Sequence, residues 1–290
     1  MRWESGLMRG VSEGERMIDG WNAAEKPLCL LISLPRSVER RARMEAQATT
    51  LPWPMVLQPG VDGTARWKEL SRSVDLRSFR RNTGREVLSG EIGCYHAHLA
   101  AWARIAESGA EAGLILEDDV VLHPGFASAV AAAMSARSEW DVLKLAHIRA
   151  RGPVCQGRLA GWRMNAYLGP ATGMGAYLIG SGAIERLLPR MLPITRPIDH
   201  EIDRSHIHDL RHFGLEPWPA HPDDGGESTI TGTDYDRVRK FSWYRRLPVH
   251  GLRVSNLLGK AAHLARYGRL LPRYGPVRTA VKVSSTTEAG

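Results

Sequence analysis

The sequence predicts an α/β domain in which short buried strands alternate with helices. Residues 28–34 and 112–116 are continuous apolar runs of strand length, as expected for parallel strands buried on both faces. A helical pattern rich in Arg, Glu, Met and Ala follows the first run at residues 38–48. A short strand pattern at 55–57 then completes the order strand–helix–strand, which is typical of α/β folds.

The other elements follow from the same patterns along the chain. Residues 64–90 are polar and interrupted by asparagine and glycine, so we expect a loop there. A helix is predicted over 91–108, with Ser89 as its N-cap and Gly109 as its stop. Beyond the second buried strand, the sequence predicts a helix over 126–137, a strand over 140–145, a loop over 149–170, a strand over 175–179 and a helix over 182–191.

The composition is that of a folded globular protein. Of the 290 residues, 43% are hydrophobic and 24% are charged. No apolar run approaches the roughly 20 residues that span a bilayer. Residues 1–26, which we expect to form a poorly ordered extension, lack the apolar core of a secretory signal. The three cysteines form no CxxC pair, so the sequence favours buried free thiols in a reducing compartment, the cytoplasm.

The positive charge is concentrated toward the C-terminal end. The chain has a formal net charge of +8, yet residues 237–283 contain twelve Lys or Arg and no Asp or Glu. Apolar residues within 252–271 recur at roughly helical spacing, with tyrosine and tryptophan nearby. We therefore expect residues 236–290 to form a basic amphipathic segment that binds an anionic membrane surface, whereas nucleic acid is not expected. A helix packed on the domain and a disordered basic tail are the alternatives.

An acidic triplet, Glu117-Asp118-Asp119, directly follows the buried strand at 112–116. In open α/β sheets the ligand crevice lies at the carboxyl ends of the strands, which is where we expect this triplet. Strand alternation would place positions 117 and 119 on one side and 118 on the other. Carboxylates arranged in this way can share a hard divalent cation whose other positions are filled by diphosphate oxygens. A solvated acidic turn is the alternative.

Ordered motifs around the triplet carry a family resemblance. They read ISLPRSVERR at 32–41, VDG at 61–63, GEIGCYHAHLAAW at 90–102, LILEDDV at 114–120, TGMGAYLI at 172–179 and PIDH at 197–200. This set resembles glycosyltransferase family 25, the lipooligosaccharide (LPS) glycosyltransferases that include β-galactosyltransferases, over roughly residues 27–232. The resemblance implies a GT-A-like, nucleotide-sugar-binding α/β sandwich around a mixed, mostly parallel sheet, with a basic C-terminal helical extension.

The resemblance also implies a bound Mn²⁺ or Mg²⁺ ion that neutralises the departing nucleoside diphosphate. By position, Glu117, Asp118 and Asp119 match the family's acidic metal-site motif. His221 is a candidate for a further metal ligand, with a plain loop histidine as the alternative. Contacts to donor or acceptor are expected from Arg40 and Arg41 at the diphosphate, from Thr172 and Gly173 at the sugar, and from Asp62, Glu91 and His98. A solvated helix face is the alternative for the arginines, and a structural histidine for His98.

Sugar transfer also needs a base that deprotonates the acceptor hydroxyl. Asp199 in the PIDH motif is the first candidate and Asp203 is the second. The alternative role of Asp199 is to cap the helix that follows it. Ser228-Thr229-Ile230 matches the late SxI element of the family and is expected to close the site.

The expected function is therefore transfer of a sugar, with galactose as the expected sugar, from a nucleotide donor to a saccharide. The acceptor would belong to a lipid-linked surface glycan such as LPS, and the family implies inversion at the anomeric carbon. The expected location is cytoplasmic, and peripheral on the inner face of the cytoplasmic membrane if the basic segment binds lipid. The alternatives are a galactosyltransferase that glycosylates protein, and a non-catalytic membrane- or nucleic-acid-binding protein with a degenerate transferase domain.

Overall fold

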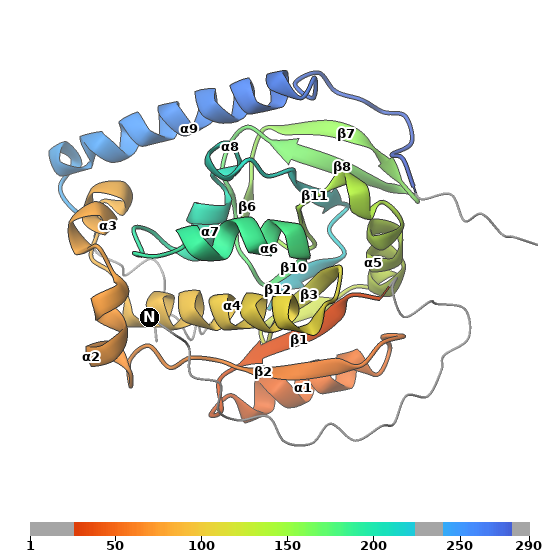
Figure 1. Cartoon of the computed structure of the whole chain (residues 1–290), viewed down its shortest axis with the longest axis horizontal. Helices are drawn as coiled ribbons and strands as arrows, with labels where there is room; N and C mark the ends of the chain where they lie inside the picture. The colour runs from red at the N-terminus through yellow and green to blue at the C-terminus, as the bar shows by residue number, and fades with distance from the viewer. Residues whose placement is uncertain (1–25, 224–239, 280–290) are drawn as a thin grey trace, which may run out of the picture.

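The computed structural model describes residues 26–223 and 240–279, which form an eight-stranded sheet between helical layers (Figure 1). From one edge of the sheet to the other, the strand order is β2 (Met55–Pro59), β1 (Leu28–Ser33), β3 (Ala112–Glu117), β10 (Ala176–Gly180), β5 (Val142–Lys144), β11 (His212–Glu216), β8 (Trp162–Tyr167) and β7 (Pro153–Leu159). The predicted α/β class is confirmed.

Parallel and antiparallel pairings both occur in this sheet, so the predicted mixed sheet is also present. The pairs β1–β2, β1–β3 and β5–β11 are parallel, whereas the pairs β3–β10, β5–β10, β8–β11 and β7–β8 are antiparallel. Antiparallel pairs are slightly more numerous because β10 is antiparallel to both β3 and β5, and β8 is antiparallel to both β11 and β7. The carboxyl ends of the parallel strands β1 and β3 lie side by side, with Ile32 opposite Glu117.

Helices cover both faces of the sheet and bury its apolar side chains. The helices of these layers include α1 (Val38–Ala48), α4 (Ser89–Ser108), α5 (Phe126–Ser135), α6 (Ser181–Leu187) and α9 (Leu247–Arg266). Leu31 and Leu114 belong to the core beneath α1 and α5, while Leu30 and Ile115 belong to the core beneath α4 and α6. Neighbouring residues of one strand thus face opposite layers, which explains why β1 and β3 read as continuous apolar runs.

Further elements connect these layers. They are α2 (Trp67–Leu70), α3 (Leu76–Thr83), α7 (Ile198–Ile202), α8 (Ser205–His208), the strand pair β4 (Val120–Leu122) and β12 (Ala220–Pro222), and the strand pair β6 (Arg149–Ala150) and β9 (Ala171–Thr172). The strands β11 and β12 had no counterpart in the sequence prediction. Their short length makes their periodicity weak.

Two segments that were predicted as loops contain regular structure. Residues 64–90 hold α2 and α3, and Asp75 begins α3 by accepting the Ser78 N–H at 3.0 Å. Residues 149–170 hold the β7–β8 hairpin, whose turn places Ala160 and Gly161 at positive φ. The predictions were wrong because glycine and polar residues mark turns and caps inside such elements as well as true loops.

The predicted C-terminal helix is present as α9 and packs against α8 and α3. It lies along the outer rim of the molecule, at the top of Figure 1. Its Lys260 ammonium is buried, 2.6 Å from Asp203 Oδ1 and 2.8 Å from the Gly169 carbonyl oxygen. Within the described residues, no helix has the length and apolar character needed to cross a bilayer. The expected N-terminal extension lies outside these residues.

Candidate active site

A cleft opens at the carboxyl ends of β1 and β3. Its walls come from four places: the end of β1, the turn after β2, the first turns of α4 and the end of β3. The lining residues are Ile32, Ser33, Leu34, Arg36, Gly60, Val61, Asp62, Gly63, Thr64, Gly90, Cys94, Ala97, Glu117, Asp118 and Asp119. The turn after β2 packs directly on α4, because a side chain at Gly63 or Gly93 would collide with the backbone of the other segment. This is the sheet edge where the sequence predicted a ligand crevice.

All three carboxylates of the acidic triplet line this cleft. β3 ends at Glu117, and Asp118 and Asp119 form the turn into β4. The expectation that position 118 would face away from positions 117 and 119 was wrong. Strand alternation stops where the strand stops, and the turn brings all three side chains to one place.

One serine and one arginine contact the acidic turn. The Ser33 hydroxyl donates to Asp118 Oδ2 at 2.6 Å. Arg40 Nη1 lies 3.6 Å from Asp118 Oδ1 and 3.7 Å from Asp119 Oδ2, so this arginine of α1 is brought to the site. Burial and the nearby negative charge of Glu117 raise the pKa of Asp119 to about 7, although Arg40 acts in the opposite direction. Asp118 and Asp119 therefore share the charge of one guanidinium.

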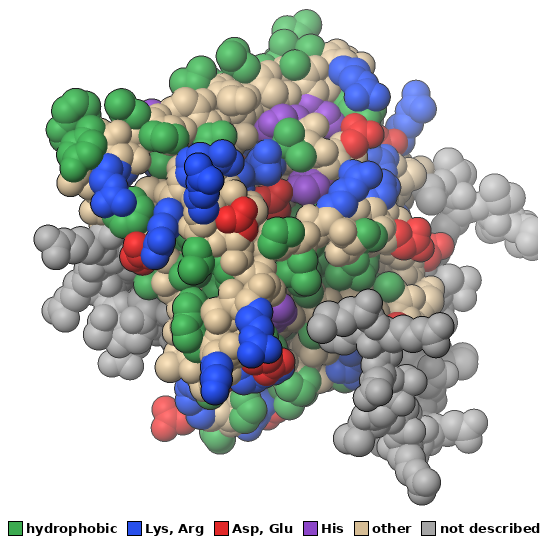
Figure 2. Space-filling model, turned by 60° about the vertical axis from the view of Figure 1, so that its left-hand side comes forward, with side chains coloured by type: hydrophobic (Ala, Val, Ile, Leu, Met, Phe, Trp, Pro, Cys, Tyr) green, Lys and Arg blue, Asp and Glu red, His purple; other side chains and the backbone are tan. Residues whose placement is uncertain are grey.

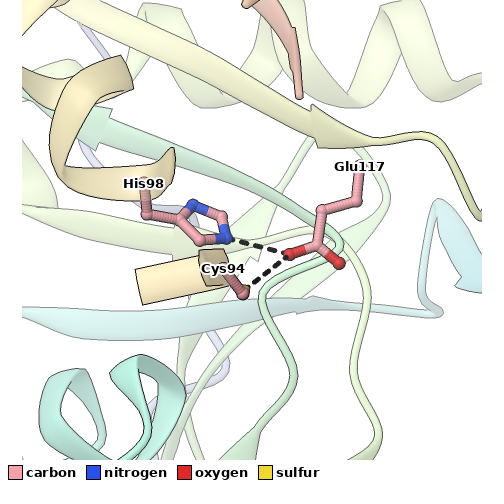
Figure 3. Close-up of side chains that lie close together, drawn as sticks. All are labelled: Cys94, His98 and Glu117. Atoms are coloured by element: carbon pink, nitrogen blue, oxygen red, sulfur yellow. Dashed lines mark hydrogen bonds and ion pairs between the residues drawn. The ribbon is translucent and has the colours of Figure 1, made fainter. Parts of the chain in front are cut away.

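Glu117 is also held from the buried side of the sheet (Figure 3). His98 Nε2 lies 2.8 Å from Glu117 Oε1, and Cys94 Sγ lies 3.8 Å from the same oxygen. His98 is fully buried and does not line the cleft, so the structure does not place it against a donor or acceptor. Among the described residues, Cys94, His98 and Glu117 are the group of three whose potential metal-ligand atoms all lie within 4.8 Å of one another.

Asp62 and Arg36 form another part of the cleft wall. Asp62 Oδ1 accepts the backbone N–H groups of Thr64 and Ala65, both at 3.0 Å. Its other oxygen forms an ion pair with Arg36. Arg36 was not among the site residues predicted from the sequence. The signal for it was its position directly after β1, at the same sheet edge as the triplet.

A second cluster surrounds Asp199, next to the cleft. The Gly173 N–H donates to Asp199 Oδ2 at 3.1 Å, and the His200 N–H donates to Oδ1 at 2.8 Å. Burial would raise the pKa of Asp199, but the electrostatic influence of His200, the Gly173 N–H and the Lys144 ammonium outweigh it and hold the pKa below its ordinary value. Asp199 is thus a carboxylate at neutral pH and can accept a proton or a hydrogen bond.

Lys144 is a charged residue of this cluster that the sequence analysis missed. Its side chain is 1% exposed, and its ammonium donates to the Ala171 carbonyl oxygen at 2.9 Å. Burial lowers the pKa of Lys144 to about 8, while Asp199 and Asp203 act against that shift. The signal was a single lysine in the apolar strand at 140–145.

The two clusters adjoin each other. The Glu117 N–H donates to the Gly175 carbonyl oxygen at 2.7 Å, two residues beyond the Gly173 that holds Asp199. Burial raises the pKa of the Cys94 thiol well above its ordinary value, and the charges of Glu117 and then Asp199 raise it further. The charges of Glu117 and Asp199 therefore both act on the same thiol.

The remaining candidate residues that the structure describes do not line the cleft. Glu91 is buried in an ion pair with Arg85, and neither lines the cleft. Asp203 accepts from Lys260 and from the Ala171 N–H.

Arg41 does not line the cleft, and His221 Nδ1 lies 2.6 Å from His123 Nε2 on the β4–β12 ribbon. Thr172 is buried in β9 beside Gly173. The Ser228–Ile230 element lies outside the described residues.

The sequence model of glycosyltransferase family 25 (LPS biosynthesis protein) matches residues 27–202, which is more than half of the chain. The chain belongs to this family. The matched range contains β1, the cleft, the acidic triplet and Asp199, and it ends just before Asp203. The cleft and the Asp199 cluster are thus both built from the family domain, whereas β11, β12 and α9 lie outside the match.

Curated relatives of this family 25 chain differ in what their names say. A rat protein named "Probable inactive glycosyltransferase 25 family member 3" is 25% identical over 73% of this chain and 42% of its own length. A Drosophila pseudoobscura family member is 35% identical over 39% of this chain and 19% of its own. Zebrafish "Procollagen galactosyltransferase 1" is 22% identical over 72% of this chain and 38% of its own. The chain spans less than half the length of these relatives.

Proposed function

We propose that this family 25 chain transfers a sugar from a nucleoside-diphosphate sugar to a hydroxyl of a saccharide acceptor. The observation that carries the proposal is the arrangement of Glu117, Asp118 and Asp119 in a cleft, with Asp199 in the adjoining cluster. The first group suits the charged, departing end of the donor, and the second suits the acceptor hydroxyl. The two reacting groups would thus meet between these clusters, beside Cys94.

The carboxylates fit a hard divalent cation such as Mn²⁺ or Mg²⁺, which prefers oxygen ligands. Glu117 and Asp119 would hold it, with Asp118 oriented by Ser33 beside them. Asp118 and Asp119 share the guanidinium of Arg40, and Glu117 lines the same cleft, so the acidic turn has an excess of negative charge that such an ion would neutralise. When bound, the ion supplies charge neutralisation for the departing diphosphate. His221 is left out because it pairs with His123.

The protein residues would then perform the transfer as a single displacement. The acceptor oxygen forms a bond to the anomeric carbon while the bond from that carbon to the diphosphate oxygen breaks, which inverts the configuration. Asp199 accepts the hydroxyl proton. Arg40 and Arg36 lie at the cleft and would meet the phosphate oxygens through charge-assisted hydrogen bonds.

Galactose is the sugar that we propose, and a saccharide of a lipid-linked surface glycan is the acceptor. The family description, LPS biosynthesis protein, and the names of the procollagen galactosyltransferases among the relatives support these two choices. Relatives with inactive in their names support a second candidate, a domain that binds without catalysis. The acidic triplet and Asp199 favour the catalytic function.

A donor screen tests this proposal directly. We expect the purified chain with Mn²⁺ to release nucleoside diphosphate from one nucleotide sugar, with UDP-galactose as the first candidate, and saccharide acceptors to accelerate that release. Chelator should abolish it, because the excess negative charge would then repel the diphosphate. Tight nucleotide-sugar binding with no turnover on any acceptor would support the non-catalytic function. Absence of both binding and turnover would contradict the proposal.

The outer face of α9 supports a further part of the proposal, docking on an anionic membrane. Its residues Val249, Lys260, His263 and Leu264 are buried against the domain. On the opposite side, Leu247, Val254 and Leu258 are 57%, 57% and 63% exposed. Positions 247, 254, 258 and 265 fall on one side of a helix with 3.6 residues per turn.

Basic and aromatic residues surround this apolar stripe. Trp243 and Tyr244 precede the helix and Tyr274 follows it, and all three are exposed. Figure 2 shows hydrophobic side chains along the upper rim of the molecule, with Lys and Arg side chains below and beside them. Apolar insertion flanked by cations and interfacial aromatics is how amphipathic helices bind anionic bilayers.

We expect the double variant Arg253→Ala/Arg266→Ala to bind anionic vesicles about 30-fold more weakly at low salt, since each cation contributes about 1 kcal/mol. Val254→Ser/Leu258→Ser should weaken the part of binding that persists at high salt. Vesicle sedimentation of the full chain measures both. Val38→Ser/Leu76→Ser, which changes exposed apolar residues of α1 and α3, is the matched control. Equal binding of all variants, or none by the wild type, would contradict membrane docking.

Deletion of the segment is the wrong test, because α9 is part of the packed structure. Removing it would leave Asp203 buried without its lysine. Breaking a buried pair in this way costs about 3–5 kcal/mol. Point changes on the exposed face separate lipid binding from folding.

A further inference from the structure

We propose that Trp102, Tyr177 and His98 are positioning residues that fix the Glu117 carboxylate in the cleft. This inference rests on the proposed function, because it concerns how the same acidic site is kept ready for its ligand. It does not place His98 against the donor. Instead, His98 acts through Glu117, from the side of the sheet that faces α4.

The three side chains form a continuous buried chain of hydrogen bonds. Trp102 Nε1 donates to the Tyr177 hydroxyl oxygen at 2.8 Å. The Tyr177 hydroxyl lies 2.9 Å from His98 Nδ1, and His98 Nε2 lies 2.8 Å from Glu117 Oε1. Each of the three is 0% exposed. Two of them come from α4 and one from β10, so the chain joins the helical layer to the sheet.

The donor and acceptor groups along this row of hydrogen bonds determine where the protons lie. An indole N–H can only donate, so the Tyr177 oxygen is the acceptor for Trp102. The hydroxyl proton of Tyr177 then needs an acceptor, and His98 Nδ1 is the neighbour that can provide it. A neutral imidazole that accepts at Nδ1 carries its proton at Nε2. His98 is therefore a fixed N–H donor aimed at Glu117.

This assignment also decides between two uses of the Cys94–His98–Glu117 group. As a metal ligand, His98 would need an unprotonated Nε2, and the buried Tyr177 hydroxyl would lose its acceptor. As a donor, His98 satisfies every polar group of the chain. A carboxylate held from behind by a rigid donor loses less freedom when it binds a cation at the cleft. Such outer contacts commonly change metal affinity by about 10–100-fold.

The first experiment reads the tautomer directly. Nitrogen-15 NMR of histidine-labelled full chain at neutral pH should show His98 protonated at Nε2, with the signal assigned by its loss in His98→Gln or His98→Asn. Tyr177→Phe removes the proton given to Nδ1 and should shift or broaden that signal. A wild-type His98 protonated at Nδ1, or a signal that Tyr177→Phe leaves unchanged, would overturn the proposal.

The second experiment measures the consequence at the cleft. Tyr177→Phe should weaken Mn²⁺ binding, followed by electron paramagnetic resonance of the free ion, by about 10-fold. Tyr95→Phe is the matched control, since Tyr95 is also buried and its hydroxyl donates to the Met191 carbonyl oxygen at 2.7 Å, away from the cleft. Tyr95→Phe loses one buried hydrogen bond and Tyr177→Phe loses two, so both should lower the melting temperature, Tyr177→Phe by more.

The outcomes separate the two proposals. Equal Mn²⁺ affinity in wild type and Tyr177→Phe would overturn the positioning role and leave the proposed function intact. A wild type that binds no Mn²⁺ would contradict the metal part of the proposed function. The tautomer of His98 would then decide by itself whether Trp102, Tyr177 and His98 position Glu117. Weaker binding in both tyrosine variants would indicate a general loss of packing and overturn the specific role.

Discussion

Asp119→Ala is expected to reduce sugar transfer by about 100-fold or more, since the charge stabilisation of a bound cation is worth several kcal/mol. Asp119 lies in the turn after β3, and its carboxylate faces the cleft together with Glu117 and Asp118. Its loss removes one of the two oxygen donors proposed for the cation. Mn²⁺-supported binding of the nucleoside diphosphate, measured by calorimetry, should weaken in parallel.

The melting temperature gives a second, independent test of Asp119. Burial and Glu117 raise the pKa of Asp119 from 3.8 to about 7, so the folded state disfavours its charged form. A carboxyl whose pKa is higher in the folded state lowers the free energy of unfolding. The loss grows as pH rises from the pKa of the unfolded state toward the pKa of the folded state. Asp119→Asn, which removes the charge and keeps the shape, should therefore melt at a higher temperature than wild type at neutral pH. Unfolding of Asp119→Asn, or full sugar transfer by Asp119→Ala in the presence of chelator, would contradict the role of Asp119.

Asp199→Asn is expected to lower turnover by about 100-fold or more while donor affinity barely changes, because it removes a proton acceptor from the acceptor side. The change is nearly isosteric. It replaces one of the two oxygens that accept the Gly173 and His200 N–H groups, and it removes a negative charge close to the buried Lys144. A modest loss of melting temperature is therefore expected. Single-turnover rates at saturating donor and acceptor provide the measurement.

Asp203→Asn is the informative comparison for that experiment. Asp203 accepts hydrogen bonds from the Lys260 ammonium at 2.6 Å and from the Ala171 N–H at 2.9 Å. Its carboxylate therefore stabilises the fold. We expect this variant to lose stability and to retain turnover in the molecules that stay folded. Normal turnover in Asp199→Asn together with lost turnover in folded Asp203→Asn would assign the base to Asp203 instead.

The patterns that predicted the fold were local ones. β1 and β3 are apolar runs because each strand is buried on both faces, and α1 and α4 have helical composition between them. The acidic triplet could be placed at the cleft because the carboxyl ends of parallel strands share one sheet edge. Arg40 lies at the acidic turn for the same reason, since α1 begins directly after β1.

The sequence by itself determined the class of fold, the edge of the sheet where the site lies, and the carboxylates that line it. Only the tertiary structure decided which charged candidates are free to serve the site. Glu91 pairs with Arg85, Asp203 with Lys260, and His98 lies behind Glu117. The physical reason is that a buried charge needs a partner, and that partner can be distant in sequence: Lys260 follows Asp203 by 57 residues. No local pattern encodes such a pairing, so burial and packing alone reveal it.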